Sequence, residues 1–326
     1  MRSLEKIETA RHISKRLEFF DMYDIVIVGS GPAGLTAALY ARRAEKSVLV
    51  IEKSGFGGQI THSPRVENYP GFVEASGSEL GDKFLEQAMA QGAEIELDAV
   101  TSIEGEPGNY KVVCENGSFD AKSVIIAAGS KHRTLGLPGE EKYTGEGVSY
   151  CAVCDGAFYK GKTVAIIGGG NTALQEAALL SDGCKKVYVI QNLAFFTGEK
   201  NLASRLYSKS NIEVRFSTIV TDILGTDTFE GIILKNTETG EEESLTVDGM
   251  FVAIGQKPEN EPFANVLKLN DYGYIEAGED CIPVGAKPGI FVAGDCRTKA
   301  IRQVTTATAD GAVAALAACR FIDSLN

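Results

Sequence analysis

The segment that decides the fold is YDIVIVGSGPAGLTAALYARRAEKSVLVIEK, residues 23–53. It reads as an apolar strand, a glycine turn, a helix and a second strand. Gly29, Gly31 and Gly34 form a G-x-G-x-x-G pattern. The first glycine permits a tight turn, the second lets backbone approach a pyrophosphate, and the third brings helix and strand close together. Pro32 suits the first helical turn, where a missing N–H costs nothing. The segment predicts the opening of a dinucleotide-binding unit.

An acidic residue stands where such a unit holds a ribose. Glu52 lies 23 residues after Gly29 (52 − 29), at the end of the second predicted strand. Its carboxylate is placed to accept hydrogen bonds from ribose hydroxyls. The helix N-terminus between them offers free N–H groups to a diphosphate. Because strand, helix and acid all flank the glycines, we interpret the pattern as a dinucleotide site.

The same architecture returns in KTVAIIGGGNTALQEAALLSDGCKKVYVIQ, residues 162–191. Gly168, Gly170 and Ala173 form G-x-G-x-x-A, and the offset between the two copies is 168 − 29 = 139. Adding 139 to Glu52 gives Gln191. An internal duplication of this kind predicts two doubly wound units. The second copy has lost the acid of the first.

The remaining segments predict how the two units are connected. Strand-like runs with turns, at 110–119 and 229–240, suit antiparallel layers laid on such sheets. The apolar strands at 123–130 and 249–260 each end at a glycine and predict crossing points between the units. A buried strand at 289–297 should end at Asp295, and an alanine-rich helix should follow from Arg302 to Phe321. We therefore predict an α/β protein of two Rossmann-like FAD/NAD(P)-binding domains, the second inserted into the first. The predicted bounds are an extension at 1–21, a first domain at 22–133 and 257–326, and a second domain at 134–256.

Composition narrows the class of protein. The chain has 326 residues, of which 44% are hydrophobic and 23% charged, ordinary values for a soluble globular protein. A net charge of −12 argues against a nucleic-acid partner, because phosphate binding needs clustered Lys and Arg. No apolar run reaches the roughly 18 residues of a spanning helix. Residues 1–21 lack the apolar segment of a signal peptide, so we expect a cytoplasmic protein.

Cysteine spacing indicates redox chemistry. Cys151 and Cys154 form a C-x-x-C with Asp155 directly following, which suits a redox disulfide in a cytosolic chain. A half zinc site is the alternative, and it needs a second ligand pair that the sequence lacks. We therefore predict no metal and interpret the other cysteines as buried small hydrophobes. These isolated cysteines are Cys114, Cys184, Cys281, Cys296 and Cys319, and His12, His62 and His132 have no evident partners.

From about Met22 to the C-terminus the chain resembles the low-molecular-weight thioredoxin reductases, FAD-containing pyridine nucleotide-disulfide oxidoreductases of class II. The resemblance rests on the first glycine pattern, GFGGQI, VENYPGF, the C-x-x-C-D before the second glycine pattern, and GIFVAGDCRTKAIRQVTTATADGAVAA. It implies FAD in the first domain, a disulfide shuttle in the second, thioredoxin as substrate and a homodimer. The implied FAD contacts are Gly29, Gly31, Gly34, Glu52, Gly58, Gln59, Asn68, Asp295, Arg302 and Gln303.

The resemblance also implies roles for the redox residues. Cys154 is expected to lie against the flavin, Cys151 to attack the disulfide of thioredoxin, and Asp155 to protonate the departing thiolate. Two implied contacts have a physical reason as well. Asp295 ends a strand, where an acid can hold the ribityl chain. The helix after Arg302 can direct its positive N-terminus at the flavin N1–O2 edge.

The chain departs from the family at the end of the second unit's second strand. Ordinary members carry His-Arg-Arg and a further Arg there to hold the 2′-phosphate of NADPH. This chain has Gln191, Asn192, Leu193 and Thr197, with Phe195 and Phe196 expected to be exposed. No arginine fork remains for a dianionic phosphate, and no acid replaces it for NADH.

Because these arginines are absent, we expect NADPH to be a poor electron donor. Their absence favours a protein donor such as ferredoxin, as in the ferredoxin-dependent branch of the family. Because ferredoxins are acidic, this donor would need a local basic patch, for which Lys185, Lys186 and Lys200 are candidates. Three alternatives remain open. They are an ordinary NADPH-dependent enzyme that binds NADPH weakly through other residues, binding of another nucleotide, and a non-catalytic nucleotide-binding or redox-sensor flavoprotein.

Overall fold

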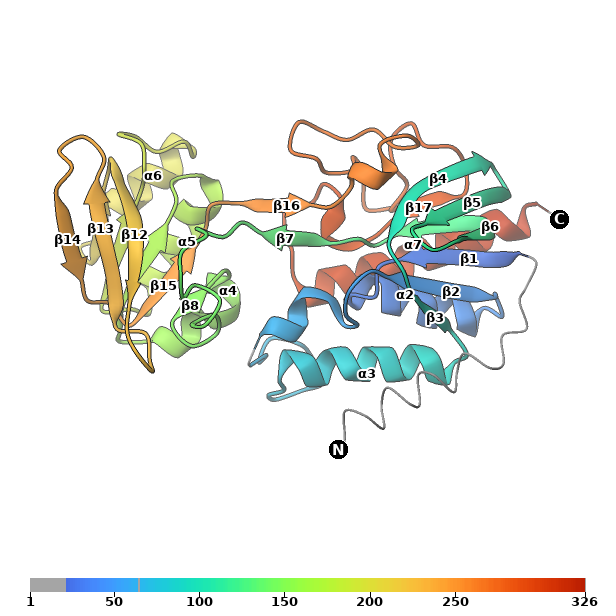
Figure 1. Cartoon of the computed structure of the whole chain (residues 1–326), viewed down its shortest axis with the longest axis horizontal. Coiled ribbons are helices and arrows are strands. Elements are labelled where there is room, and N and C mark those ends of the chain that lie inside the picture. The colour runs from blue at the N-terminus through green and yellow to red at the C-terminus, as the bar shows by residue number, and fades with distance from the viewer. Residues whose placement is uncertain (1–21, 64, 326) are drawn as a thin grey trace.

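The structure is a computed structural model that describes residues 22–63 and 65–325. Two α/β halves lie side by side and are joined by a pair of short strands (Figure 1). The predicted extension at 1–21 lies outside the described residues.

The first half is built on a seven-stranded sheet in the order β3-β2-β1-β6-β5-β4, with β17 also pairing with β6. Its parallel part consists of β1 (Tyr23–Val28), β2 (Val48–Glu52), β3 (Glu94–Leu97), β6 (Ser118–Ile126) and β17 (Ile290–Val292). Strands β4 (Val100–Glu106) and β5 (Asn109–Cys114) add the predicted antiparallel layer. Strand β2 is buried at every position, as expected when both faces of a parallel sheet are covered.

Three helices cover one face of this sheet (Figure 1). They are α2 (Pro32–Arg43), α3 (Gly77–Ala90) and α7 (Val304–Asp323). Alanines of α2 and α7 share one buried cluster with strand residues such as Ile25 and Val50. Small side chains let the two helices approach closely, and a Cβ at Gly311 would come within 2.2 Å of the carbonyl oxygen of Ala33. This packing brings the N-termini of α2 and α7 close to the strand ends.

The second half repeats the plan on a smaller sheet. Its five parallel strands run in the order β11-β10-β9-β15-β8, and α5 (Asn171–Ser181) and α6 (Lys200–Tyr207) belong to the same unit. The strands are β8 (Val148–Ser149), β9 (Thr163–Ile167), β10 (Lys186–Ile190), β11 (Ile212–Arg215) and β15 (Gly249–Val252). A three-stranded antiparallel sheet of β12 (Thr218–Leu224), β13 (Gly231–Asn236) and β14 (Glu242–Leu245) packs against it.

The two halves are connected at the predicted crossing points. Strand β7 (Ser130–His132) leaves the first half, and β16 (Gln256–Pro258) returns to it, paired antiparallel with β7. Figure 1 shows this two-stranded link between the halves. The prediction of two Rossmann-like domains, with the second inserted into the first, is confirmed.

Two predicted boundaries were wrong by two or three residues. The strand before Asp295 ends at Val292, and Asp295 itself lies in the short turn η4 (Gly294–Cys296). Helix α7 starts at Val304 rather than at Arg302, because Gln303 is the N-cap and forms a capping box with Thr306. Among the described residues no helix is long and apolar enough to cross a membrane.

Candidate active site

The first glycine turn forms an open backbone cradle at the N-terminus of α2. Gly29 has φ +105°, and a Cβ there would lie 2.4 Å from the carbonyl oxygen of Ala127. A Cβ at Gly34 would lie 1.9 Å from the carbonyl oxygen of Gly29, so only glycine fits. Gly31 has free space beside it, bounded by the Cα of Gly58 at 3.8 Å. The N-terminus of α2 has no side-chain cap, which leaves N–H groups for a diphosphate.

Glu52 lies beside this turn with its carboxylate fixed. The backbone N–H and the hydroxyl of Ser30 both donate to one carboxylate oxygen at 2.8 Å, and the N–H of Ser54 donates to the other at 3.0 Å. Glu52, Gly29 and Glu259 line a cavity of about 70 Å³. The predicted ribose acceptor is therefore buried, oriented and next to an opening.

Asp295 offers an unsatisfied buried acceptor. Within the described residues its Oδ1 is buried and has no hydrogen-bond partner. Burial raises the pKa of Asp295, while Lys299 and Arg302 act in the opposite direction. The guanidinium of Arg302 lies over the ring of Tyr274 at 4.4 Å, and its buried Nε also lacks a described partner. Orphaned buried groups of this kind fit a polar ligand such as the ribityl chain of a flavin.

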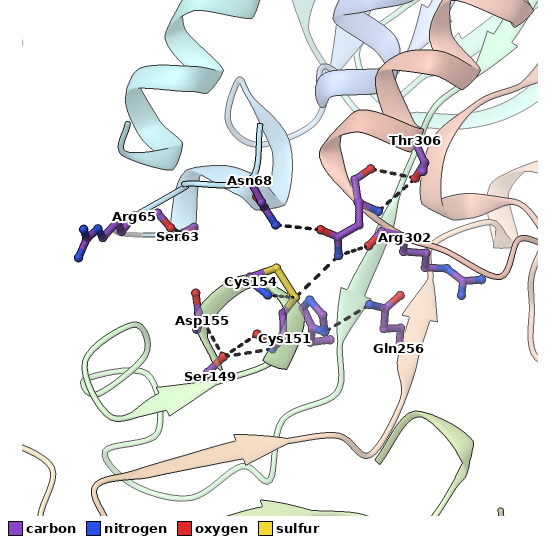
Figure 2. The surroundings of a disulfide bond; sticks show 12 residues. Ser63, Arg65, Asn68, Ser149, Cys151, Cys154, Asp155, Gln256, Arg302 and Thr306 are labelled. Atoms are coloured by element: carbon purple, nitrogen blue, oxygen red, sulfur yellow. Dashed lines mark hydrogen bonds between the residues drawn. A yellow bond between two sulfur atoms is a disulfide. The ribbon is translucent and has the colours of Figure 1, made fainter. Parts of the chain in front are cut away.

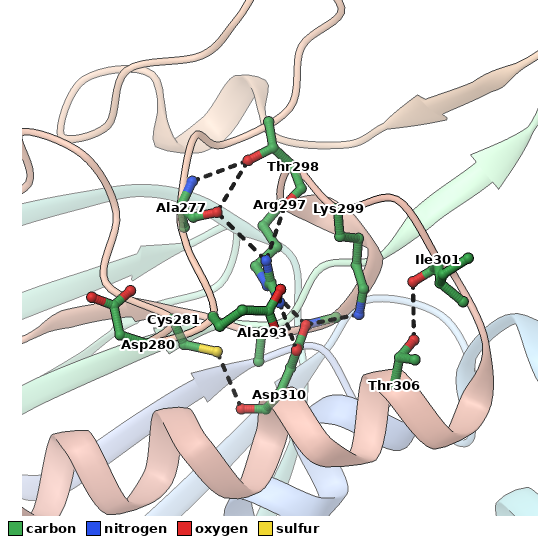
Figure 3. Close-up of polar contacts among 12 residues, drawn as sticks. Ala277, Asp280, Cys281, Ala293, Arg297, Thr298, Lys299, Ile301, Thr306 and Asp310 are labelled. Atoms are coloured by element: carbon green, nitrogen blue, oxygen red, sulfur yellow. Dashed lines mark hydrogen bonds and ion pairs between the residues drawn. The ribbon is translucent and has the colours of Figure 1, made fainter.

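A buried ion cluster holds the turn that carries Asp295 (Figure 3). The carboxylate of Asp310, on α7, accepts the N–H of Gly294 at 2.9 Å and two hydrogen bonds from the Arg297 guanidinium at 2.8 and 2.9 Å. Lys299 donates to the same carboxylate at 2.9 Å. Arg297 is only 1% exposed. This cluster was not predicted, although all of its members lie within the stretch 289–315 quoted above, because the residue types alone do not show which side chains pair.

The redox pair sits at the start of a short helix, α4 (Ala152–Asp155), and the structure joins Cys151 to Cys154 in a disulfide (Figure 2). Cys151 is the N-cap, and the N–H of Cys154 points at its sulfur at 3.1 Å. The hydroxyl of Ser149 donates to Asp155 at 2.6 Å and accepts the N–H of Cys151 at 3.1 Å. Burial raises the pKa of Asp155, which the Ser149 hydrogen bond partly opposes. A carboxyl group with this shift is suited to hold a proton next to a sulfur.

Residues from both halves meet at this disulfide (Figure 2). The side-chain nitrogen of Gln303 lies 3.9 Å from the sulfur of Cys151, and Asn68 donates to the side-chain oxygen of Gln303 at 3.2 Å. Because Gln303 caps α7, the sulfurs face the positive end of that helix. A second contact between the halves, Arg65 over the ring of Phe158 at 4.9 Å, was not predicted. Gln59, by contrast, is exposed on the short helix η1 (Gly58–His62), and its side chain contacts none of these site residues through a hydrogen bond within the described part of the chain.

The second glycine turn is covered by side chains of the chain itself. Gln191 is buried against Gly169, where a Cβ would lie 2.4 Å from the Gln191 side chain. Its amide donates to the carbonyl oxygen of Phe195 at 3.1 Å, and the hydroxyl of Thr197 donates to that of Gly169 at 3.2 Å. Both side chains therefore make internal hydrogen bonds at the place where the resemblance implies that other members hold a 2′-phosphate.

The two phenylalanines that follow β10 differ in how much of each side chain is exposed. Phe195 is 61% exposed, as expected. Phe196 was expected to be exposed and is half-buried, because its ring packs on Phe216 at 4.8 Å and near Tyr207. Arg215 lies next to the strand end but is ion-paired with glutamates of its own half.

Comparison with known proteins defines first the class and then the family. Residues 23–311 match the family model of pyridine nucleotide-disulphide oxidoreductases, a class of flavin-linked enzymes. A thioredoxin reductase of Bacillus subtilis is 40% identical over 308 residues, which cover 94% of this chain and 96% of that protein. The chain belongs to the low-molecular-weight thioredoxin reductase family, as the resemblance implied. It is thus a flavoprotein oxidoreductase with a redox disulfide.

Solved structures of the same family superpose on this chain to different extents. Thioredoxin reductase from Streptococcus pyogenes superposes with a TM-score of 0.89 at 38% identity, covering 93% of this chain and 99% of that chain. The Lactococcus lactis enzyme, described as being in the FR conformation, has 37% identity and the same coverage but a TM-score of 0.64. The two enzymes are nearly equally identical to this chain in sequence, but the first superposes on it more completely.

Proposed function

We propose that this chain is an FAD-dependent thioredoxin-disulfide reductase that receives its electrons from a protein. The observation that carries the proposal is the position of the Cys151–Cys154 disulfide. It faces the N-cap of α7, in the half that also holds the open glycine cradle and the orphaned carboxylate of Asp295. One ligand can reach all three features if it carries a diphosphate, a polyhydroxyl chain and a redox ring, and FAD has these parts.

The residues proposed to hold FAD follow from the contacts above. The backbone of Gly29, Gly31 and Gly34 would receive the diphosphate at the α2 N-terminus, with Glu52 beside the ribose and Asp295 at the ribityl chain. Bound flavin supplies electron-pair transfer to the disulfide. The positive end of α7 would stabilise negative charge on a group bound next to it. The remaining proposed contacts are Gly58, Gln59, Asn68, Arg302 and Gln303.

Thiol–disulfide exchange between the reduced enzyme and oxidised thioredoxin needs no other reactant. The thiolate of Cys151 attacks one sulfur of the thioredoxin disulfide, which forms a mixed disulfide and breaks the thioredoxin S–S bond. Asp155 gives its proton to the departing thiolate. The thiolate of Cys154 then attacks the sulfur of Cys151, which restores the enzyme disulfide and releases the second thioredoxin thiolate. The enzyme dithiol is oxidised and the thioredoxin disulfide is reduced.

A protein electron donor is supported by the contacts at the second glycine turn, where the side chains that could bind a nucleotide are already paired within the chain. Gln191 and Thr197 are engaged with backbone carbonyls, and Arg215 is paired with Glu213 at 2.7 Å. A plant-type ferredoxin lies about 130 mV below thioredoxin, or roughly 6 kcal/mol for two electrons, so this route is energetically favourable. Of the candidate docking lysines, Lys186 is ion-paired with Glu213 at 2.9 Å, which makes Lys185 and Lys200 the better candidates.

One experiment tests the donor. The bound flavin is mixed anaerobically with NADPH, NADH or reduced ferredoxin, and its bleaching is followed. We expect ferredoxin to bleach it rapidly and both nicotinamides slowly. Fast bleaching by NADPH would show the ordinary family donor. A matched variant carrying Asn192→Arg, Leu193→Arg and Thr197→Arg should gain NADPH-dependent bleaching, because it restores cations for the 2′-phosphate.

An assembly of two copies is proposed from an exposed apolar face on the first half. Tyr40 of α2 and Val313 and Leu316 of α7 are 41%, 37% and 43% exposed. Between α2, α3 and α7 lies a groove of about 310 Å³ lined by Leu39, Tyr40 and Phe84 among others. A second copy covering this face would bury these side chains. Light scattering should show a dimer that Leu316→Glu shifts toward monomer.

We also propose bounds for the two domains and a compartment for the protein. The domain bounds stay at 22–133 with 257–326 and at 134–256, which the two separate sheets support. The cytoplasm stays the expected compartment, where a dithiol shuttle can be kept reduced.

A further inference from the structure

The short turn η4 is held at both of its ends by one carboxylate, that of Asp310 on α7 (Figure 3). At the start of the turn, the backbone N–H of Gly294 donates to Oδ2 of Asp310 at 2.9 Å. At its end, the Arg297 guanidinium donates from Nε to Oδ2 at 2.9 Å and from Nη2 to Oδ1 at 2.8 Å. Asp295 lies between these two points, and its buried Oδ1 is the acceptor without a described partner. The carboxylate of Asp310 therefore fixes the backbone on both sides of the proposed flavin contact.

The charges around Asp310 are buried and paired. Lys299 donates to Oδ2 of Asp310 at 2.9 Å, and Nη1 of Arg297 donates to the carbonyl oxygen of Thr298 at 2.9 Å. Burial acts to raise the pKa of Asp310, but the hydrogen bonds from Arg297 and Lys299 outweigh it and hold that pKa below its ordinary value. Apolar side chains of similar volume often stabilise a fold as well as a buried ion cluster does. We therefore expect the cluster to serve the geometry of the turn.

The same turn packs against the first turn of α2, which carries the diphosphate cradle. Gly294 has φ +78°, and a Cβ there would lie 2.9 Å from the Cβ of Ala33. Gly311, the residue after Asp310, approaches the carbonyl oxygen of Ala33 so closely that its own Cβ would lie 2.2 Å away. Asp310 thus stands where α7, η4 and α2 meet. The contacts described above for the cradle do not include its carboxylate, so the cradle and the turn can be tested separately.

We propose that Asp310 is a positioning residue for the flavin end of the cofactor, because it holds η4 so that Asp295 faces the ribityl chain. This inference rests on the proposed function. Binding of the adenosine diphosphate end is left to the glycine cradle and does not depend on Asp310. Loss of the Asp310 charge therefore affects ligands that carry a ribityl chain and spares ligands that lack one.

Titration of the deflavinated chain with two ligands tests this division. ADP carries adenosine and the diphosphate only, whereas FAD adds the ribityl chain and the ring. In Asp310→Asn we expect the Kd for FAD to rise by about tenfold or more, because the amide cannot form the charged pair with Arg297. The Kd for ADP should change by less than about twofold, since the cradle is intact. Equal losses of both ligands would indicate a general structural role and overturn the proposal.

The matched control is Glu279→Gln, which removes a carboxylate on the solvent side of the same guanidinium. Glu279 lies 3.7 Å from Nη2 of Arg297, and its side chain is 96% exposed. Because an exposed pair of this kind contributes little, both Kd values should stay at those of the parent chain. If Asp310→Asn does not fold, the triple variant Arg297→Met, Lys299→Met and Asp310→Leu replaces it, since apolar side chains fill the same space without holding η4. The same loss of FAD with retention of ADP is expected.

A double-mutant cycle shows whether Asp310 acts through Asp295. FAD affinity is measured for Asp295→Asn, for Asp310→Asn and for the chain with both substitutions. If Asp310 serves only to position Asp295, the second substitution should add less than about twofold to the loss caused by Asp295→Asn alone. Losses that multiply would mean that the two residues act independently, and the proposal would be wrong.

Hydrogen exchange tests the hold on the turn in the absence of any ligand. Peptides that span 290–297 are followed by mass spectrometry in the deflavinated chain. We expect the amide of Gly294 to exchange about tenfold faster in Asp310→Asn than in the parent chain or Glu279→Gln, while peptides from α2 stay unchanged. Unchanged exchange at η4 would contradict the proposal. If the parent chain binds no FAD, the proposed function fails as well, whereas a parent that binds FAD no better than Asp310→Asn removes this inference alone.

Discussion

At the residue scale, the seven cysteines divide by their surroundings rather than by their chemistry. The five isolated cysteines are all buried, as predicted. Burial raises the pKa of Cys114, Cys281 and Cys296 to about 12 in each case, so these thiols stay protonated and unreactive. The pair at Cys151 and Cys154 instead lies half-buried at a helix N-terminus. A helix dipole and partial access to solvent make this pair the site of exchange.

Cys151→Ser should abolish thioredoxin reduction while flavin binding and flavin reduction survive. The serine cannot form a mixed disulfide, but no predicted FAD contact is changed. Visible absorbance measures the bound flavin, and thioredoxin-coupled thiol release measures the exchange. Cys184→Ala, in the core of the same half, serves as the control and should keep activity. Loss of the flavin from Cys151→Ser would show that the role of this cysteine is misassigned.

Glu176→Gln should change the pH dependence of stability. Because burial raises the pKa of Glu176 to about 7, the folded state binds its proton more tightly than the unfolded state does. Its favourable contribution is complete below an unfolded pKa near 4.5 and is lost as pH rises through about 7. The variant should therefore gain about 2 to 3 kcal/mol relative to the parent chain between pH 5 and pH 8. Urea unfolding at the two pH values measures this, and equal differences would contradict it.

At the element scale, the two glycine turns share a sequence pattern but differ in whether a side chain fits at the third position of the pattern. In the first turn, a Cβ at Gly34 would overlap the carbonyl oxygen of Gly29 at 1.9 Å. In the second turn the third position of the pattern is occupied by Ala173. A Cβ added at Gly168 would lie 3.2 Å from the Cβ of Ala173. The helix of the second unit thus stands about a methyl group further from its strand. The first turn keeps the closer approach that its cradle needs.

Gly34→Ala should therefore displace α2 from β1. We expect flavin binding to weaken by at least tenfold, because the backbone cradle cannot form. Fluorescence titration of the deflavinated protein with FAD measures the affinity. Gly117→Ala is the control, since that glycine lies in the turn between β5 and β6 and has no atoms within 4 Å of its would-be Cβ. Unchanged affinity in Gly34→Ala would show that this turn does not bind the diphosphate.

At the scale of the whole molecule, the redox pair is placed between the halves and not on an outer face. Cys151 approaches Gln303 across the boundary, and Arg65 lies over Phe158 nearby. Because the first half lies against Cys151, we expect the halves to separate before a protein substrate can dock on the sulfurs. The two-stranded link of β7 and β16 is the part of the chain that such a movement would bend.

Cross-linking the halves should leave electron transfer between the flavin and the disulfide intact but block transfer from the disulfide to thioredoxin. In a chain with Arg65→Cys and Phe158→Cys, a short thioether linker is added while the Cys151–Cys154 pair is oxidised and protected. We expect the flavin and the disulfide still to exchange electrons, while thioredoxin reduction falls more than tenfold because the sulfurs stay covered. The single variants treated with the same linker are the controls. Full thioredoxin reduction in the linked chain would mean that this arrangement already admits the substrate.

Much of the fold could be predicted because its signals are local. The glycine turn, Pro32 and the apolar run of β2 specify a strand–turn–helix–strand unit by backbone sterics alone, and a repeat of that pattern at Gly168 specifies a second unit. The redox role of Cys151 and Cys154 followed from their spacing. Phe196 was misjudged because its burial depends on Phe216, which is far away in the sequence.

By itself the sequence determined which local units form, that the second lacks its phosphate-binding arginines, and that two cysteines can pair. Only the tertiary structure decided that Cys151 faces Gln303, that Asp310 holds the turn of Asp295, and that Asp155 accepts a hydrogen bond from Ser149. The reason is physical. Steric and hydrogen-bonding preferences act over a few residues, whereas desolvation and charge coupling depend on which distant elements the packing brings together.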